Sequence, residues 1–187
     1  MAITKPQGPS GGAAVVGRAV AHLMARGPGA LPPLAGAAAP QTSQPIRLFM
    51  LNLKDISDES FLKKAVPIGW RYVIVGPGPI AVADVKDAGG GAPGFASLIR
   101  GTIAQRLEQA SELAQQYESR PGLFEPRILE IPSLYISAFW LHGPHEIFIP
   151  FLEGGEKDTM PVKEDPSFVT RVAQAASKHA SVGVASP

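Results

Sequence analysis

The chain has no cysteine among its 187 residues. Disulfide bonds, thiolate metal ligands and cysteine nucleophiles are therefore excluded together, and the fold must be held by packing alone. No apolar run approaches the roughly 20 residues that a helix needs to cross a membrane. We expect a soluble protein without a membrane span and place it in the cytoplasm, with a targeting role for the N-terminus as the open alternative.

Acidic residues are missing from the N-terminal part of the chain. No Asp or Glu precedes Asp55, so the five basic residues before it give that stretch +5, and the other 12 basic and 16 acidic residues give the rest −4. Residues 1–45 are rich in Ala, Gly and Pro, which predicts a basic leader and linker, followed by a single domain over 46–187. Because the body is mildly acidic, we expect no nucleic-acid partner.

One short amphipathic helix is expected within the leader, at about 13–26. Arg18, His22 and Arg26 recur every fourth residue along one side of it. The residues predicted to dock on a partner lie around the rest of the helix: Val16, Val20, Leu23 and Met24. A flexible leader, a docking segment and a targeting sequence all fit this pattern, although Arg18 interrupts the apolar region that a secretory signal needs.

From Ile46 onward the pattern predicts an α+β fold with a mainly antiparallel sheet of five to six strands. The strands are expected at about 46–53, 69–75, 79–85, 127–131, 133–141 and 145–152. A short helix capped by Ser57 should follow the first strand, and a C-terminal helix with Asp165 as its cap should close the chain over 166–179. Pro150 lacks a backbone donor, which favours an edge position for its strand.

A long amphipathic helix is expected at about 94–118. Apolar residues recur there at helical spacing: Phe95, Leu98, Ile99, Ile103, Leu107, Ala110, Leu113, Ala114 and Tyr117. A continuous apolar stripe needs a wide partner surface, so this helix should pack on the sheet.

The turn between the last two expected strands reads His-Gly-Pro-His. Two imidazoles and a carboxylate, from His142, His145 and Glu146, are weak catalytic candidates and could begin a metal site. The spacing differs from the helical H-E-x-x-H pattern, and Gly143-Pro144 suits an ordinary turn. We therefore favour a solvated hairpin tip and predict no metal site.

A glycine-rich loop before the long helix offers weak anion-binding candidates at Gly89, Gly90 and Gly91. It lacks the lysine and hydroxyl of a phosphate-binding loop, and Asp84 and Asp87 would repel an anion. We favour a flexible loop and expect no cofactor.

Two function classes follow from these patterns. The first is a non-enzymatic interaction or structural module whose N-terminal segment docks on a protein partner or on another copy, which gives self-association. The second is a hydrolytic enzyme with a cleft near the turn of His142 and His145, with Asp84 or Asp87 as further members. We favour the first because no catalytic signature accompanies the acid-free amphipathic leader.

Overall fold

The computed structural model describes residues 2–25, 41–58, 60–75, 79–87, 91–119, 122–154 and 161–182. Three helices lie within these ranges: α1 Gly12–Ala25, α2 Thr102–Gln115 and α3 Phe168–Val182. The strands are β1 Ala2–Ile3, β2 Gln41–Thr42, β3 Ile46–Met50, β4 Val66–Val75, β5 Pro79–Lys86, β6 Gly94–Arg100, β7 Leu123–Ile131, β8 Ile136–His142 and β9 Ile147–Leu152. The fold is α+β, as the sequence predicts, but with more strands than the five to six expected.

The strands form a mostly antiparallel sheet with the order β6-β5-β4-β3-β7-β8-β9. The pairing of β3 with β7 is parallel, and it joins a meander of β3 to β6 to a meander of β7 to β9. Two short strands lie off this path, with β1 on β7 and β2 on β4. Because β9 ends the order, Pro150 lies in an edge strand, as its missing backbone donor predicts.

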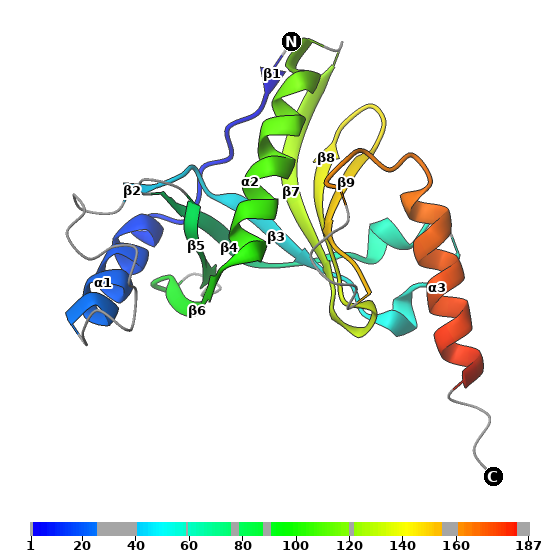
Figure 1. The fold of residues 1–187 in the computed structure, drawn as a ribbon, viewed down its shortest axis with the longest axis horizontal. Coiled ribbons are helices and arrows are strands. Elements are labelled where there is room, and N and C mark those ends of the chain that lie inside the picture. Colours follow the sequence, from blue (N-terminus) through cyan, green and yellow to red (C-terminus); the bar gives the residue numbers. More distant parts are fainter. Residues whose placement is uncertain are drawn as a thin grey trace.

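The sheet curves around α2, which contacts β5 and β6 near one end of the strand order and β8 and β9 at the other (Figure 1). The helix buries Leu107, Ala110 and Ala114 completely or nearly so, which are members of the predicted apolar stripe. They pack with the residues of β3, β4, β7, β8 and β9 that face the same way. We call this side of the sheet the concave face.

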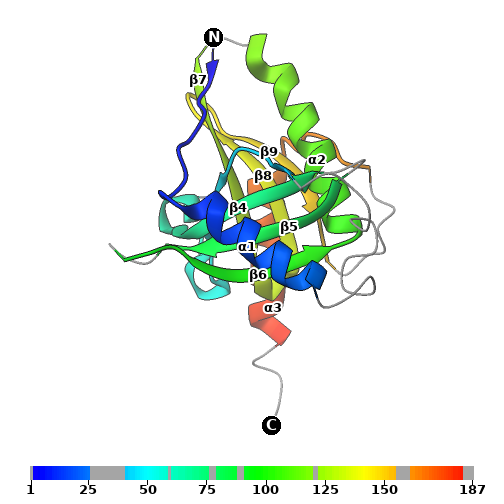
Figure 2. The ribbon, with the colours of Figure 1, turned by 90° about the vertical axis from the view of Figure 1, so that its left-hand side faces the viewer.

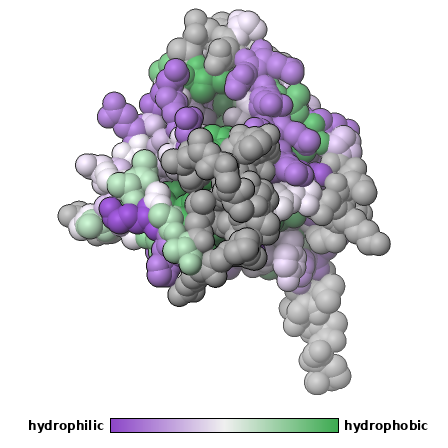
Figure 3. Space-filling view, turned by 60° about the vertical axis from the view of Figure 1, so that its left-hand side comes forward, coloured by the Kyte–Doolittle hydropathy of each residue, from purple (hydrophilic) through white to green (hydrophobic). Residues whose placement is uncertain are grey.

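The opposite, convex face is covered by two separate layers, of which Figure 2 shows α1 in front of β4, β5 and β6. Helix α1 lies over β4, β5 and β6, where Val16 and Val20 pack with Tyr72. Helix α3 and the 3₁₀ turns at Leu53–Asp55 and Phe61–Lys64 contribute to a second apolar cluster over β7, β8 and β9. Both faces of the sheet are therefore apolar along much of its width, whereas the outer surface that Figure 3 shows carries many hydrophilic residues.

The predicted helix at about 94–118 is wrong in its first part. Residues 94–100 form β6 and pair with β5, Gly101 has φ 87°, and the helix begins at Thr102. Leu98 faces α1 while the next residue, Ile99, faces α2. Because a strand covered on both faces carries apolar residues at successive positions, its pattern imitated the start of an amphipathic helix.

Two smaller expectations also need correction. The short helix predicted after the first strand is a pair of 3₁₀ turns, and the carboxylate of Asp58, not the hydroxyl of Ser57, accepts the backbone N–H of Ser60 at 2.7 Å. The strand predicted at 133–141 begins only at Ile136, because Pro132–Leu134 form a 3₁₀ turn. The C-terminal helix is present, and Asp165 accepts the N–H of Ser167 at 2.9 Å just before it.

Candidate functional site

The two histidines of the His-Gly-Pro-His turn lie against opposite faces of the sheet. The His142 ring meets Trp140 edge-on, with centroids 5.4 Å apart, and Trp140 belongs to the convex-face core. The His145 ring meets Phe124 edge-on at 5.2 Å, and Phe124 belongs to the concave-face core. The imidazoles therefore do not converge on one ion, and the described residues hold no group of three or more His, Asp or Glu that could bind a metal.

The third candidate of this turn, Glu146, joins two of its neighbours. Its carboxylate lies 2.9 Å from Nδ1 of His142 and accepts the indole N–H of Trp140 at 2.5 Å. A histidine oriented by a carboxylate is half of a hydrolytic arrangement, which also needs a hydroxyl beside the free ring nitrogen. Within the described chain, the hydrogen bonds of the His142 side chain go to Glu146, so the turn holds His142 and Trp140 in place without a nucleophile.

The inner side of the turn is packed against the start of β7. A Cβ atom on Gly143 would lie 2.5 Å from a ring carbon of Phe124 and 2.8 Å from the carbonyl oxygen of Leu123. A glycine is needed where the turn crosses the start of β7 so closely. Pro144, His145 and Glu146 are exposed, so only the outer part of this turn is a solvated tip.

Of the glycine-loop candidates, Gly89 and Gly90 lie outside the described residues, and Gly91 is exposed. The aspartates beside the loop are engaged elsewhere. Asp84 accepts hydrogen bonds from Arg71, and Asp87 accepts the indole N–H of Trp70 at 2.9 Å. These carboxylates therefore belong to the fold of the sheet.

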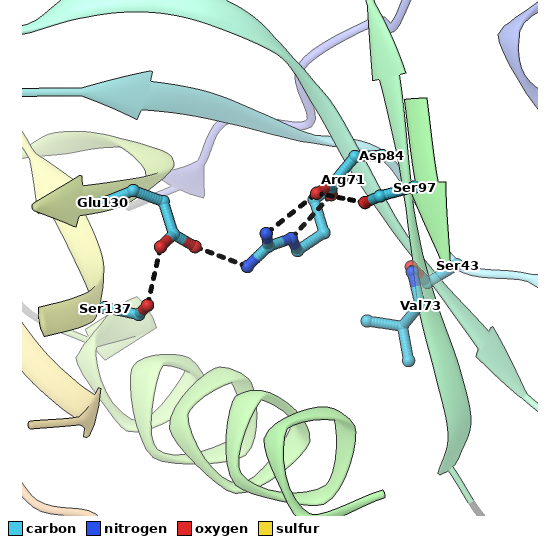
Figure 4. A network of polar contacts seen from close by, with 7 residues as sticks. All are labelled: Ser43, Arg71, Val73, Asp84, Ser97, Glu130 and Ser137. Atoms are coloured by element: carbon cyan, nitrogen blue, oxygen red, sulfur yellow. Dashed lines mark hydrogen bonds and ion pairs between the residues drawn. The ribbon is translucent and has the colours of Figure 1, made fainter. Parts of the chain in front are cut away.

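A buried ion-pair network crosses the concave face (Figure 4). Arg71 on β4 is only 3% exposed, and it donates from Nε and Nη2 to Asp84 at 2.7 and 3.0 Å and from Nη1 to Glu130 at 2.7 Å. Ser97 donates to Asp84 at 2.9 Å and Ser137 donates to Glu130 at 2.7 Å. Residues from β4, β5, β6, β7 and β8 are thus tied together across the short strand β3.

This network has two carboxylates for one guanidinium. Burial disfavours the charged form of Arg71, but the hydrogen bonds and charges of Asp84 and Glu130 outweigh it, so the pKa of Arg71 lies above its ordinary value. Both serine hydroxyls near it are already donors to a carboxylate. The arrangement is a cross-link between the two meanders, and it leaves no free base to activate Ser97 or Ser137.

A row of aromatic and basic side chains crosses the convex face. The strand registers place Trp70, Arg47, Arg127 and Trp140 as successive neighbours on β4, β3, β7 and β8. The Arg47 guanidinium lies 4.6 Å from the Trp70 ring centre, and that of Arg127 lies 4.8 Å from the Trp140 ring centre. Cation–π contacts of this kind stabilise by about 0.5–1 kcal/mol each at exposed sites.

The arginines of this row also have carboxylate partners. Arg47 lies 2.7 Å from Asp87 and Arg127 lies 2.5 Å from Glu125. Each guanidinium is therefore shared between a ring and an acid. We interpret the row as a second cross-link over β3, on the face opposite the Arg71 network.

The predicted docking residues lie on the sheet of their own chain. Val16 and Val20 are 0% and 1% exposed and pack on β4 and β5, and Leu23 is partly buried beside them. The side chain of Met24 lies outside the described part. The segment before the helix is fitted to the same surface, since a Cβ atom on Gly8 would lie 2.8 Å from the Tyr72 hydroxyl oxygen.

The first residues of the chain extend the sheet. Ala2 and Ile3 pair in parallel with Leu123 and Phe124, and the backbone N–H of Thr4 donates to the Phe124 carbonyl at 2.7 Å. The N-terminal segment, defined as residues 2–25, therefore adds a short strand beside β7 and a helix over the convex face.

A cavity of about 570 Å³ opens where the sheet divides. On the N-terminal side of Ile46, β3 no longer lies between β4 and β7. There β4 pairs with β2 and β7 pairs with β1, and these two short strands border the gap between β4 and β7. Residues 3–6 line one wall, residues 43–46 line the other, and the second half of α2 forms the back. We call this site the cleft; neither His142 nor His145 lines it.

The sequence missed the cleft and both cross-links. One signal was available: Arg71, Asp84 and Glu130 each interrupt an apolar strand, which is unusual unless charges meet in the fold. The cleft had no comparable signal, because Glu108 and Glu112 look like ordinary solvent-facing residues of an amphipathic helix.

Among the described residues, no helix has the length and apolar character needed to cross a membrane. Comparisons with protein-family models, with curated proteins and with solved structures found no match.

Proposed function

We propose that this chain is a non-enzymatic interaction module whose N-terminal segment docks on its own sheet or, by exchange, on the sheet of another copy. The observation that most supports this is the burial of Val16 and Val20, 0% and 1% exposed, by a sheet face that their own helix covers. The apolar side of α1 packs on an apolar surface of β4 and β5, which favours a specific docking site over a passive leader.

The chain connection allows the same contacts to form between copies. Residues 26–40 join the N-terminal segment to the body, and a stretch of this length reaches at most about 50 Å when extended. A second copy can therefore supply the segment without any new contact. Exchange of an identical element is a common route to symmetric dimers.

Exchange is favoured over simple release because release leaves apolar surface uncovered on both the segment and the sheet. Helix α1 has 14 residues, and isolated helices of that length are marginal in water. Release would also expose Tyr72 and Ile74, which α1 now covers. Two copies satisfy both surfaces reciprocally, so the balance between the closed single chain and the exchanged pair should depend on concentration.

The hydrolytic alternative has less support. His142 bonds to Glu146 and packs on Trp140, while the cleft is lined by other residues. A catalytic histidine would be expected to border the concave site where a substrate binds.

Cross-linking in this cysteine-free chain tests the exchange. One preparation carries Ala2→Cys and another carries Leu123→Cys, positions that are register partners of β1 and β7. Neighbouring strands bring such positions within the range that a disulfide bridges. After refolding together, a disulfide between the two preparations above the level of chance collisions requires that one chain's segment lies on the other's sheet.

We expect this inter-chain disulfide to increase with protein concentration. Gln109→Cys, exposed on α2, replaces Ala2→Cys as the matched control for chance collisions. Inter-chain product no greater than in this control at every concentration would rule the proposal out.

A further inference from the structure

We propose that the cleft binds a small organic amine with an apolar body. This site is separate from the docking surface of α1. Its floor is apolar, with Ile46, Val73 and Phe139 each less than a tenth exposed. Its volume of about 570 Å³ lies within the range of 300–1,000 Å³ that is usual for small-molecule sites.

The back wall carries two acidic residues in an unfavourable position. Glu108 and Glu112 are four residues apart on α2, so their like charges are neighbours on one side of the helix. Glu112 also lies in the last turn of α2, where the helix dipole disfavours negative charge. No cation lies in the last turn of the helix to offset them.

Neither carboxylate has a hydrogen bond or ion pair among the described residues, although Glu108 is half-buried. The cleft wall opposite holds a single basic residue, Lys5, which is exposed. With two glutamates against one lysine, the residues that line the cleft carry a net charge of −1 at neutral pH. A bound cation would relieve the repulsion that the fold otherwise retains.

The walls are held firmly enough to form a site without a ligand. Ser43 donates its backbone N–H to the Val73 carbonyl at 2.7 Å, and its hydroxyl oxygen accepts the N–H of Val73 at 3.0 Å. Thr4 is fixed to the Phe124 carbonyl on the other wall. A bound amine would place its ammonium group near Glu108 and Glu112 and its apolar part on Val73 and Phe139.

Three probes of one shape separate charge from hydrophobicity: phenethylamine, 2-phenylethanol and phenylacetate. Each is titrated into the full ¹⁵N-labelled chain while backbone chemical shifts are followed. We expect phenethylamine to give saturable shifts in residues 3–6, 43–46 and 108–115. The alcohol should bind at least tenfold more weakly, and the carboxylate should bind more weakly still.

The variants test the acidic wall directly. Glu108→Gln with Glu112→Gln should lower the affinity for phenethylamine at least tenfold and abolish its advantage over 2-phenylethanol. Lys5→Gln should leave binding unchanged or strengthen it. Gln109→Ala, on the same helix but outside the cleft, is the matched control and should bind like the parent chain.

Equal affinity for the amine and the alcohol would overturn the proposal, as would shifts confined to other residues or a double variant that binds like the parent. Circular dichroism on each variant checks that the total helix content is unchanged. Because this titration follows the cleft and cross-linking follows pairing of copies, the amine site and the exchange can fail independently.

Discussion

Gly12 lies against Tyr72 so closely that a Cβ atom on Gly12 would be 2.2 Å from the Tyr72 hydroxyl oxygen. Tyr72 is 2% exposed and stands in the middle of the sheet, so its ring has little room to retreat. Because Gly12 has no side chain, the start of α1 can pack closely on Tyr72. This contact links the position of the N-terminal segment to one side chain of the body.

We expect Gly12→Ala to loosen the N-terminal segment while the body stays folded. Overpacking of this kind costs about 1–3 kcal/mol. Trypsin cleavage at Arg18, which is exposed on α1, measures the docking, and its rate should rise several-fold.

The matched control for this variant is Gly17→Ala. Nothing lies within 4 Å of a Cβ atom at Gly17, in the middle of the same helix. Alanine there should stabilise α1 by about 0.5–1 kcal/mol and slow the cleavage. Equal cleavage rates for the two variants would contradict the close fit of Gly12 on Tyr72.

Tyr72 should also make the docked segment sensitive to high pH. Burial raises the pKa of its phenol, so the fold favours the protonated form. That contribution is fully present below the ordinary tyrosine pKa of about 10 and is lost as the pH rises through the raised value.

Denaturation by urea between pH 8 and 11 checks this. The parent chain should lose stability relative to Tyr72→Phe as the pH exceeds about 10. Tyr135→Phe, which alters a tyrosine that is 68% exposed, serves as the control. A Tyr72→Phe chain whose stability falls as steeply as that of the parent would show that another group is responsible.

The sequence predicted α2, where one buried side gives a clear period, and missed β6, which is covered on both faces and leads directly into that helix. The stripe of Leu107, Ala110 and Ala114 repeats at helical spacing because α2 buries a single side. Leu98 and Ile99 contact different helices, so the period of two that marks a strand is lost in β6. The apolar residues of β6 also continue into the stripe of α2 with only Gly101 and Thr102 between Arg100 and Ile103, so the local pattern merged the strand with the helix.

The cross-links were out of reach for a different reason. Arg71 and Glu130 are 59 positions apart in the chain, and their contact exists only because β3 brings two meanders together in parallel. The turn residues His142 and His145 show the converse. They are neighbours in sequence, yet the turn sends their rings to opposite faces, so proximity along the chain overstated their chance of cooperating.

Replacing Arg71 by Met should strongly destabilise the sheet. Two carboxylates would be left without their cation beneath β4, and breaking a buried ion pair costs about 3–5 kcal/mol. The lower end of that range is expected, because the Glu130 side chain keeps 21% of its surface in contact with solvent. Urea denaturation measures the loss.

A neutral triple variant separates charge from packing. Arg71→Met with Asp84→Asn and Glu130→Gln removes the uncompensated charges and should recover a large part of the stability. If the triple variant is no more stable than Arg71→Met alone, the network stabilises by the shape of the Arg71 side chain and not by its charge.

The last prediction concerns the C-terminal helix at low pH. Burial alone would raise the pKa of Asp165, but its hydrogen bonds with Ser167 and Arg171, together with the Arg171 charge, outweigh this and hold the pKa below the ordinary value. A lowered pKa stabilises the fold above the unfolded value of about 3.9 and is lost as the pH falls through the folded one. Because Ser167 N and Arg171 Nε each lie 2.9 Å from Asp165, protonation should loosen the start of α3 first.

We expect amide exchange in α3 to accelerate below about pH 4 while β7 and β8 stay protected, and Asp165→Asn to show that fast exchange already at neutral pH. Asp55→Asn, on the 3₁₀ turn over the same half of the sheet, is the control and should leave α3 unchanged. Protection of α3 in Asp165→Asn equal to that of the parent chain would show that Phe168 and Val172 hold the helix without the carboxylate.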